Sequence, residues 1–178
     1  MLTLKVRGKE MWDEKKEEFV YTGGGTLHLE HSLVAISKWE ASHRRSFLSG
    51  GQKTAEEMAD YIKCMSVGDC DESIFDSLTN ENITEIFEYI ESPMTATYLR
   101  EDRGGGSSSE KVTSELIYYW MITLGIPFEC QYWHVNRLMT LIRVCAAKNR
   151  SGKHSKRDML RSNAALNAAR RAKSGSKG

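Results

Sequence analysis

Few residues in this chain have the types and spacing that chemistry requires. Cys130 and His134 are four positions apart, so on a helix both side chains would lie on one face and could share a metal ion. A structural zinc site needs four ligands, and the other cysteines and histidines show no matching spacing. We therefore expect no metal site, and we expect His134 to be a hydrogen-bonded residue at the edge of the core.

Two further groups of ionisable residues fall short of a catalytic pattern. His28 and His31 would point to opposite faces of a predicted strand, so we expect them at the surface or at the strand end. Four glutamates repeat at helical spacing and predict a solvated helix face, which could also receive a basic segment of this chain or of a neighbour. They are Glu81, Glu85, Glu88 and Glu91. General acid–base work needs a carboxyl group in a pocket, and no pattern predicts one. The sequence thus predicts a protein that is not an enzyme, with no catalytic residue and no cofactor.

The elements around these residues predict an α+β fold that is mainly α. A small antiparallel β unit is expected over about residues 1–31, because residues 2–7, 19–21 and 27–29 have strand patterns. Turns are predicted at 13–18 and 23–25. Residues 100–110 carry three glycines without the Lys-Ser/Thr pair of a phosphate-binding loop, so they predict a flexible connection.

Helices are predicted from residue 32 to residue 149. Ser32 can cap a helix that carries Leu33, Ile36 and Trp39. Thr54 opens a capping box for a helix that reaches about residue 65. A short helix is expected at 71–78, and Thr79 caps another that must end before Pro93.

Residues 111–124 and 129–148 predict two helices that pack as an antiparallel hairpin at the core of the domain. Residues 116–122 are apolar on every side, so the first helix should be buried all round, or partly by a second subunit. The apolar arc of the second helix holds Tyr132, Val135, Leu138, Met139, Ile142, Cys145 and Ala146. Opposite that arc, Trp133 and Arg137 can stack as a cation–π pair. This pair is either an interface anchor or packs beneath the N-terminal sheet.

Charge is strongly segregated along the chain. Residues 143–178 hold eleven Lys or Arg and one acid, Asp158, whereas the first 142 residues hold fourteen bases and twenty-three acids. We expect one domain over residues 1–149, a polar linker at 150–155, and a basic tail over 150–178 that is partly disordered and becomes helical on a partner. The tail could bind an acidic protein, or nucleic acid through residues 150–173, or stay solvated. Its candidate partner-binding residues are Arg157, Arg161, Arg170 and Arg171.

The compartment follows from what the sequence lacks. No N-terminal signal peptide and no apolar run of membrane-spanning length is present, so we expect a cytosolic protein without membrane contact. The four cysteines, at positions 64, 70, 130 and 145, have no CxxC spacing and should be reduced.

Several stretches of the chain form a recognisable set. The stretches are Leu29-Glu30-His31-Ser32-Leu33, Ser37-Lys38-Trp39-Glu40, Leu78-Thr79-Asn80-Glu81-Asn82, Pro93-Met94-Thr95-Ala96-Thr97, Ser114-Glu115-Leu116-Ile117-Tyr118-Tyr119-Trp120-Met121, Ile126-Pro127-Phe128-Glu129-Cys130, Trp133-His134, Asn136-Arg137-Leu138 and Asn163-Ala164-Ala165-Leu166-Asn167-Ala168-Ala169-Arg170-Arg171. Together they resemble a type of small protein from the tail-morphogenesis region of long-tailed bacteriophages, the tail assembly chaperones. The resemblance spans nearly the whole chain, apart from the glycine-rich segments at Gly23 and Gly104.

The resemblance implies a function without chemistry. Such a protein would bind the tape-measure protein or the tail-tube protein in the host cytoplasm and keep the tape measure soluble while the tube polymerises. Self-association through the helix hairpin is a further expectation. Two alternatives remain: a structural tail or connector protein that stays in the virion, and a nucleic-acid-binding protein that acts through the basic tail.

Overall fold

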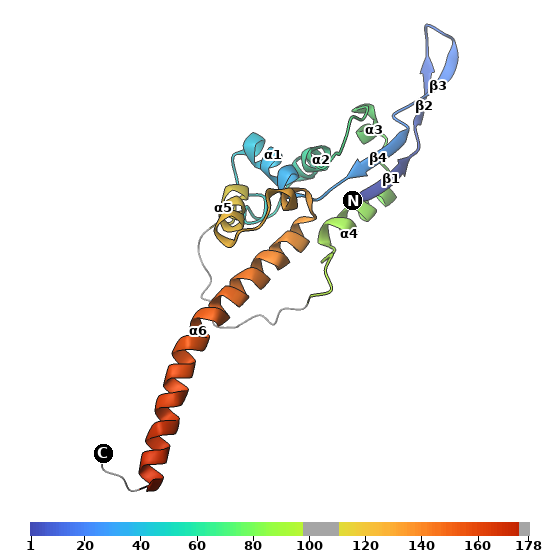
Figure 1. Cartoon of the computed structure of the whole chain (residues 1–178). Coiled ribbons are helices and arrows are strands. Elements are labelled where there is room, and N and C mark those ends of the chain that lie inside the picture. Colours follow the sequence, from blue (N-terminus) through green and yellow to red (C-terminus); the bar gives the residue numbers. More distant parts are fainter. Residues whose placement is uncertain (98–110, 175–178) are drawn as a thin grey trace.

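A computed structural model describes the backbone of residues 1–97 and 111–174 (Figure 1). The fold is mixed α+β and mainly helical, with a small antiparallel β unit at the N-terminus followed by helices, as the sequence predicts. The loop expected at 100–110 lies outside the described residues. Within the described ranges, no helix combines the length and the hydropathy needed to cross a membrane.

The β unit is one long two-stranded ribbon. Strands β1 (Leu2–Val6) and β4 (Gly25–Leu29) pair at its base, and β2 (Lys9–Asp13) and β3 (Glu18–Thr22) pair in its outer half. Val6 faces Gly25, and Lys9, three residues later in the chain, faces Thr22. The register therefore continues from one pair of strands to the other without an inserted residue. The chain therefore reverses only at residues 14–17, and the outer half projects beyond the body (Figure 1).

Two details of the β unit differ from the sequence prediction. Strand β2 was not predicted, because three of its five residues are charged; it forms because β3 offers a continuous antiparallel partner. The predicted turn at 23–25 is instead a break in the ladder where the strands stay side by side. Gly23 has φ of +70°, and a Cβ there would lie 2.4 Å from the carbonyl oxygen of Ser73, so only glycine fits between the ribbon and the next element.

Four helices follow the ribbon: α1 (Leu33–His43), α2 (Ala55–Cys64), α3 (Ser73–Asp76) and α4 (Asn80–Glu91). The predicted caps are confirmed. The Ser32 hydroxyl accepts from the Ala35 amide at 3.2 Å, and Thr54 and Thr79 each form a capping box. The inner faces of these helices and of β1 and β4 form the first core, around the fully buried Trp39 and Tyr61.

A second core joins α5 (Ser114–Leu124), the 3-10 helix η1 (Phe128–Tyr132) and the start of α6 (Val135–Ser174). Leu33 of α1 is buried in it, so α1 links the two cores. The buried Glu40 fixes this junction, because its carboxylate accepts from the amides of Phe47 at 2.8 Å and Ser114 at 2.7 Å. Each oxygen thus satisfies a buried backbone donor that would otherwise lack a partner.

The predicted hairpin needs three corrections. Its second helix begins at Val135 and not at residue 129, because residues 128–132 form a 3-10 turn and Trp133 is extended. The predicted linker at 150–155 is helical backbone, and α6 continues without a break to Ser174. The first helix is not buried all round, since Tyr119 and Ile122 are exposed. Burial of these two side chains by a second subunit stays a prediction.

Candidate partner-binding site

The predicted Trp133–Arg137 pair forms at the start of α6. The guanidinium carbon of Arg137 lies 4.2 Å from the centroid of the Trp133 ring, which is a cation–π stack. Trp133 is half-buried and packs against the second core rather than beneath the β unit, whereas Arg137 is exposed. A charge is therefore held in a fixed place at the surface by an anchored aromatic ring.

The start of α6 is tied to segments that are far away in sequence. The Val135 amide donates to the His31 carbonyl at 2.7 Å, next to a β-bridge between Ser32 and His134. The Asn136 side-chain amide donates to the carbonyls of Ile90 at 3.1 Å and Ser92 at 2.9 Å. The end of β4, the end of α4 and the start of α6 are thus held as one unit.

His134 has the structural role that the sequence predicts. Its Nδ1 accepts from the Asn136 amide at 3.3 Å, so in the neutral ring Nε2 carries the proton and donates to the Tyr89 carbonyl at 2.9 Å. The ring is buried, and this burial lowers the pKa of His134. Cys130 is also buried, but in η1 rather than on the same helix as His134. In the part of the chain that the structure describes, no three His, Cys, Asp or Glu side chains are grouped to hold a metal ion.

His31 lies beside His134 at the strand end and is buried as well. The two rings are 4.9 Å apart edge to face, and His31 Nδ1 is hydrogen-bonded to the Tyr61 hydroxyl. Burial, with a smaller contribution from His134, lowers the pKa of His31 to about 3. The predicted strand-end position is confirmed, but the residue is not at the surface. This histidine pair is uncharged at neutral pH and lies in the buried contact between the end of β4 and the start of α6.

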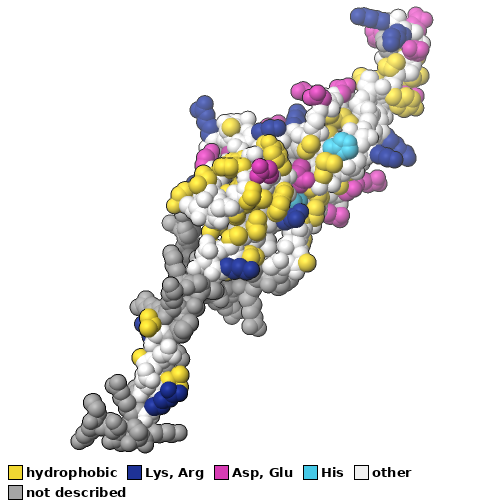
Figure 2. Space-filling model, in the orientation of Figure 1, with side chains coloured by type: hydrophobic (Ala, Val, Ile, Leu, Met, Phe, Trp, Pro, Cys, Tyr) yellow, Lys and Arg dark blue, Asp and Glu magenta, His cyan; other side chains and the backbone are white. Residues whose placement is uncertain are grey.

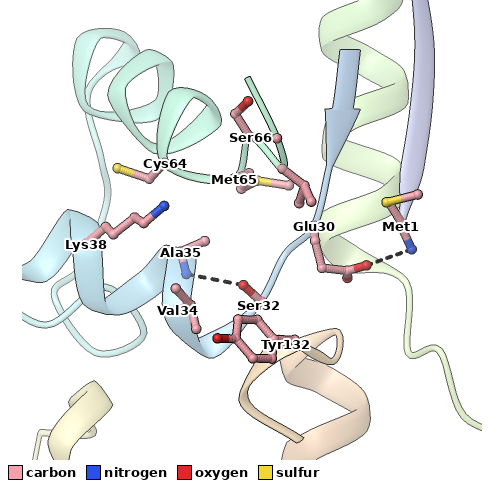
Figure 3. Close-up of a pocket in the computed structure, with 12 residues that line it drawn as sticks. Met1, Glu30, Ser32, Val34, Ala35, Lys38, Cys64, Met65, Ser66 and Tyr132 are labelled. Atoms are coloured by element: carbon pink, nitrogen blue, oxygen red, sulfur yellow. Dashed lines mark hydrogen bonds and ion pairs between the residues drawn. The ribbon is translucent and has the colours of Figure 1, made fainter. Parts of the chain in front are cut away.

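A cavity of about 330 Å³ opens beside this unit, between β4, α1 and the segment after α2. Figure 3 shows Val34, Ala35 and Tyr132 on one side and Met65 on the other, with Lys38 at the rim. The Glu30 carboxylate beside the cavity is satisfied: it pairs with the Met1 amino group at 2.7 Å and accepts from the Tyr89 hydroxyl at 2.6 Å. The cavity is mostly apolar, with the Lys38 ammonium group at its edge.

A second hollow of about 200 Å³ adjoins the first. Its lining includes Trp133, His134 and Arg137, and it shares Met1, Glu30 and Tyr132 with the first cavity. Tyr132 therefore separates two neighbouring hollows, one apolar and one bordered by the Arg137 guanidinium. An apolar side chain could enter the first while a carboxylate pairs with Arg137 beside the second.

Aromatic side chains extend this surface from Tyr132 toward α5. Tyr132 is 64% exposed and Phe128 is 53% exposed. Tyr118 lies between α5 and η1: its hydroxyl donates to Gln131 Oε1 at 2.9 Å, and its ring is 6.3 Å from that of Phe128. Burial and the neighbouring Tyr132 raise the pKa of Tyr118. Figure 2 shows hydrophobic side chains gathered over this part of the body.

We define the aromatic corner as the surface formed by Tyr118, Phe128, Tyr132, Trp133 and Arg137, together with the cavity beside Tyr132. Its chemistry suits non-covalent binding, because it offers large apolar area, pockets and the guanidinium of Arg137 stacked on Trp133. Tyr132 was placed on the buried arc of a helix by the sequence analysis. That assignment is wrong, because residues 128–132 form a 3-10 turn whose repeat directs the side chain outward. The cavity residues Glu30 and Lys38 gave no sequence signal as a site.

Helix α6 leads away from the body (Figure 1). Arg161 and Arg170 lie on its distal half, are exposed, and are not brought to the aromatic corner. The side chains of Arg157 and Arg171 lie outside the described part of the structure. The glutamates of α4 are exposed, as predicted.

Comparisons leave the family open. No family model, curated protein or solved structure matches this chain.

Proposed function

We propose that this protein is a non-enzymatic morphogenesis factor of a tailed bacteriophage, a tail assembly chaperone that binds the tape-measure or tail-tube protein. The observation that carries the proposal is the aromatic corner, an exposed apolar surface with pockets on a folded body. Large aromatic residues exposed together are typical of protein-binding surfaces.

The residues that resemble phage tail assembly chaperones support the same proposal. The stretch from Leu29 to Leu33 and the stretch from Trp133 to Leu138 are about a hundred residues apart in sequence, yet the bridge between Ser32 and His134 joins them. Phe128 belongs to a third such stretch. Four of the five corner residues lie in stretches that carry the resemblance, and Tyr132 lies between two of these stretches; the four are Tyr118, Phe128, Trp133 and Arg137.

The chemistry of the corner defines the partner segment. The apolar cavity and the exposed rings suit an amphipathic helix with a large apolar side chain. Lys38 and Arg137 favour carboxylates on the flanks of that helix. A tape-measure protein, as a long helix with apolar stripes, would offer such segments. The basic distal half of α6 would add electrostatic attraction to an acidic client.

The test is affinity capture of the tagged protein from infected cells, with nuclease treatment and mass spectrometry of the tape-measure and tube proteins. Phe128→Ser and Tyr132→Ser should each weaken recovery of the client roughly 10- to 100-fold, because each removes a large apolar contact. Leu166→Ser is the matched control, since Leu166 is 52% exposed but lies on the distal part of α6. It should leave recovery unchanged.

Three results would contradict the proposal. If the tape-measure or tube protein is still recovered with both corner substitutions, the binding surface lies elsewhere on the protein. Recovery of nucleic acid alone, removed by nuclease and lost when the chain ends at Lys148, would make the protein a nucleic-acid binder. Retention of the protein in purified particles at fixed stoichiometry would make it a structural virion component.

A further inference from the structure

The outer half of the β-ribbon is an arm that projects from the body, and the contacts with the body that the structure describes lie at its inner end, at Lys9 and Thr22. We define the arm as β2 and β3 with the turn between them, residues 9–22. Phe19 is 64% exposed and Tyr21 is 74% exposed, and Met11 and Trp12 are exposed as well. An isolated two-stranded ribbon is at best marginally stable in water. Within the arm, the rings of Trp12 and Phe19 make a cross-strand contact with centroids 4.9 Å apart.

The base of the ribbon, in contrast, is covered. The Val67 amide donates to the His28 carbonyl and the Glu30 amide donates to the Met65 carbonyl, so residues 65–67 protect the edge of β4. Helix α4 packs against β1. At the break in the ladder, Ser77 follows α3, and its hydroxyl donates to the Thr22 carbonyl at 3.4 Å, so this contact reaches the last residue of β3. Among the described residues, the backbone of β2 makes no hydrogen bond outside the ribbon.

An open edge strand normally carries charges that oppose pairing with another chain. The charges of β2 have a different arrangement: Lys9 and Asp13 lie two positions on either side of Met11. If β2 pairs antiparallel with β2 of a second copy about Met11, Lys9 of each copy lies opposite Asp13 of the other. Met11 then lies opposite Met11, and Glu10 opposite Trp12. This register matches opposite charges at both ends and an apolar pair at the centre.

We propose that the arm is a self-association surface, in which β2 strands of two copies pair antiparallel about Met11 and form a four-stranded sheet. The contact has twofold symmetry, so both copies use the same surface. Side chains alternate along a strand, so Trp12, Phe19 and Tyr21 of both copies share one face of the new sheet. The proposal is independent of the function proposed above.

Cysteine cross-linking tests the register directly. Residues opposite each other in an antiparallel pair have Cα atoms about 4.5–5.5 Å apart, which suits a disulfide. Met11→Cys should therefore give covalent dimers on mild oxidation, located at position 11 by peptide mapping under non-reducing conditions. Val20→Cys is the matched control, because Val20 is the cross-strand neighbour of Met11 on the same face. In the proposed sheet the two Val20 residues are three strand spacings apart, roughly 14 Å, and should not cross-link.

Charge exchange provides a second test that does not depend on cysteine chemistry. In sedimentation experiments on the full chain, Lys9→Glu and Asp13→Lys should each weaken dimerisation about tenfold, because each converts two attractive pairs into repulsive ones. The double variant should restore dimerisation, since the pairs re-form with reversed sign. Lys9 also donates to the Asp76 carbonyl, so rescue separates loss of pairing from loss of that contact.

A monomeric wild-type protein at all concentrations would overturn the proposal. Cross-linking of Val20→Cys without cross-linking of Met11→Cys would overturn it too, because the β3 edge would then be the interface. Failure of the double charge variant to recover would refute the proposed register.

Discussion

At the residue scale, the buried histidine pair decides how the site responds to pH. His31 and His134 join the end of β4, the end of α4 and the start of α6 while both rings are neutral. Protonation of His134 would place a second donor at Nδ1, where the Asn136 amide already donates. Protonation of His31 would place a charge in the core. The contact between the end of β4, the end of α4 and the start of α6 therefore depends on both imidazole rings being neutral.

The pKa of His31 predicts a loss of stability in mild acid. An unfolded chain binds a proton at this residue as pH falls below the ordinary value of 6.5, whereas the folded chain resists protonation until about pH 3. The contribution of the neutral His31 ring to the free energy of unfolding should therefore be present above pH 6.5. The free energy of unfolding should fall by about 2 kcal/mol between pH 6.5 and 5. Urea unfolding at a series of pH values measures this slope.

His31→Asn should reduce the slope, whatever its effect on stability at pH 7. His28→Asn is the control, because His28 lies on the ribbon with its ring against the Thr3 hydroxyl at 3.0 Å rather than in the core. An unchanged slope in His31→Asn would mean that other groups cause the acid sensitivity.

At the element scale, the ribbon is positioned where its glycines meet α3. Gly23 lies so close to this helix that a Cβ would be 2.3 Å from Ser77 Oγ and 2.4 Å from the Ser73 carbonyl oxygen. The ladder breaks there and resumes in register, so the arm leaves the body in a fixed direction. The short α3 thus acts as the support of the ribbon.

A pair of alanine substitutions separates this close approach from backbone strain. Gly23→Ala should lower the free energy of unfolding by about 2–4 kcal/mol, because it combines a positive φ with a clash against backbone. Gly125→Ala has a similar φ of +65° with open space around it, so it should cost only about 1 kcal/mol. Urea unfolding of both variants makes the measurement. Equal losses would show that α3 does not rest against Gly23.

At the scale of the whole molecule, the chain has an acidic body and a long basic helix that leads away from it. Figure 1 shows the arm and the distal part of α6 at opposite ends. Leu160 and Leu166 on the distal helix are exposed, and none of the side chains that the structure describes in this half of α6 belongs to either core.

Removal of the distal helix should therefore leave the body intact. A chain that ends at Lys148 should have a free energy of unfolding within about 0.5 kcal/mol of the full chain, because the described side chains beyond residue 148 are all exposed. Tryptophan fluorescence in urea reports this, since all four tryptophans precede residue 148. A clear loss of stability would show that the basic helix folds back onto the acidic body in solution.

The sequence alone predicted the features that depend on neighbours along the chain. Helix starts at Ser32, Thr54 and Thr79 were found because a capping hydroxyl acts on amides three residues away. The mainly helical α+β class, the Trp133–Arg137 stack and the separation of charge followed from periodicity and composition. None of these needs knowledge of how distant segments meet.

Only the tertiary structure decided the features that depend on distant partners. Strand β2 exists because β3 pairs with it, despite its charged composition. Trp133 is extended, and His134 forms a β-bridge with Ser32, about a hundred residues away in the sequence. Helix α6 therefore begins later than the sequence predicted, and the side chain of Tyr132 is left outside the helix and points outward. The aromatic corner and the cavity beside it arise where those segments converge. Local energetics set where helices begin, whereas pairing and burial between remote segments set which surface is left to bind.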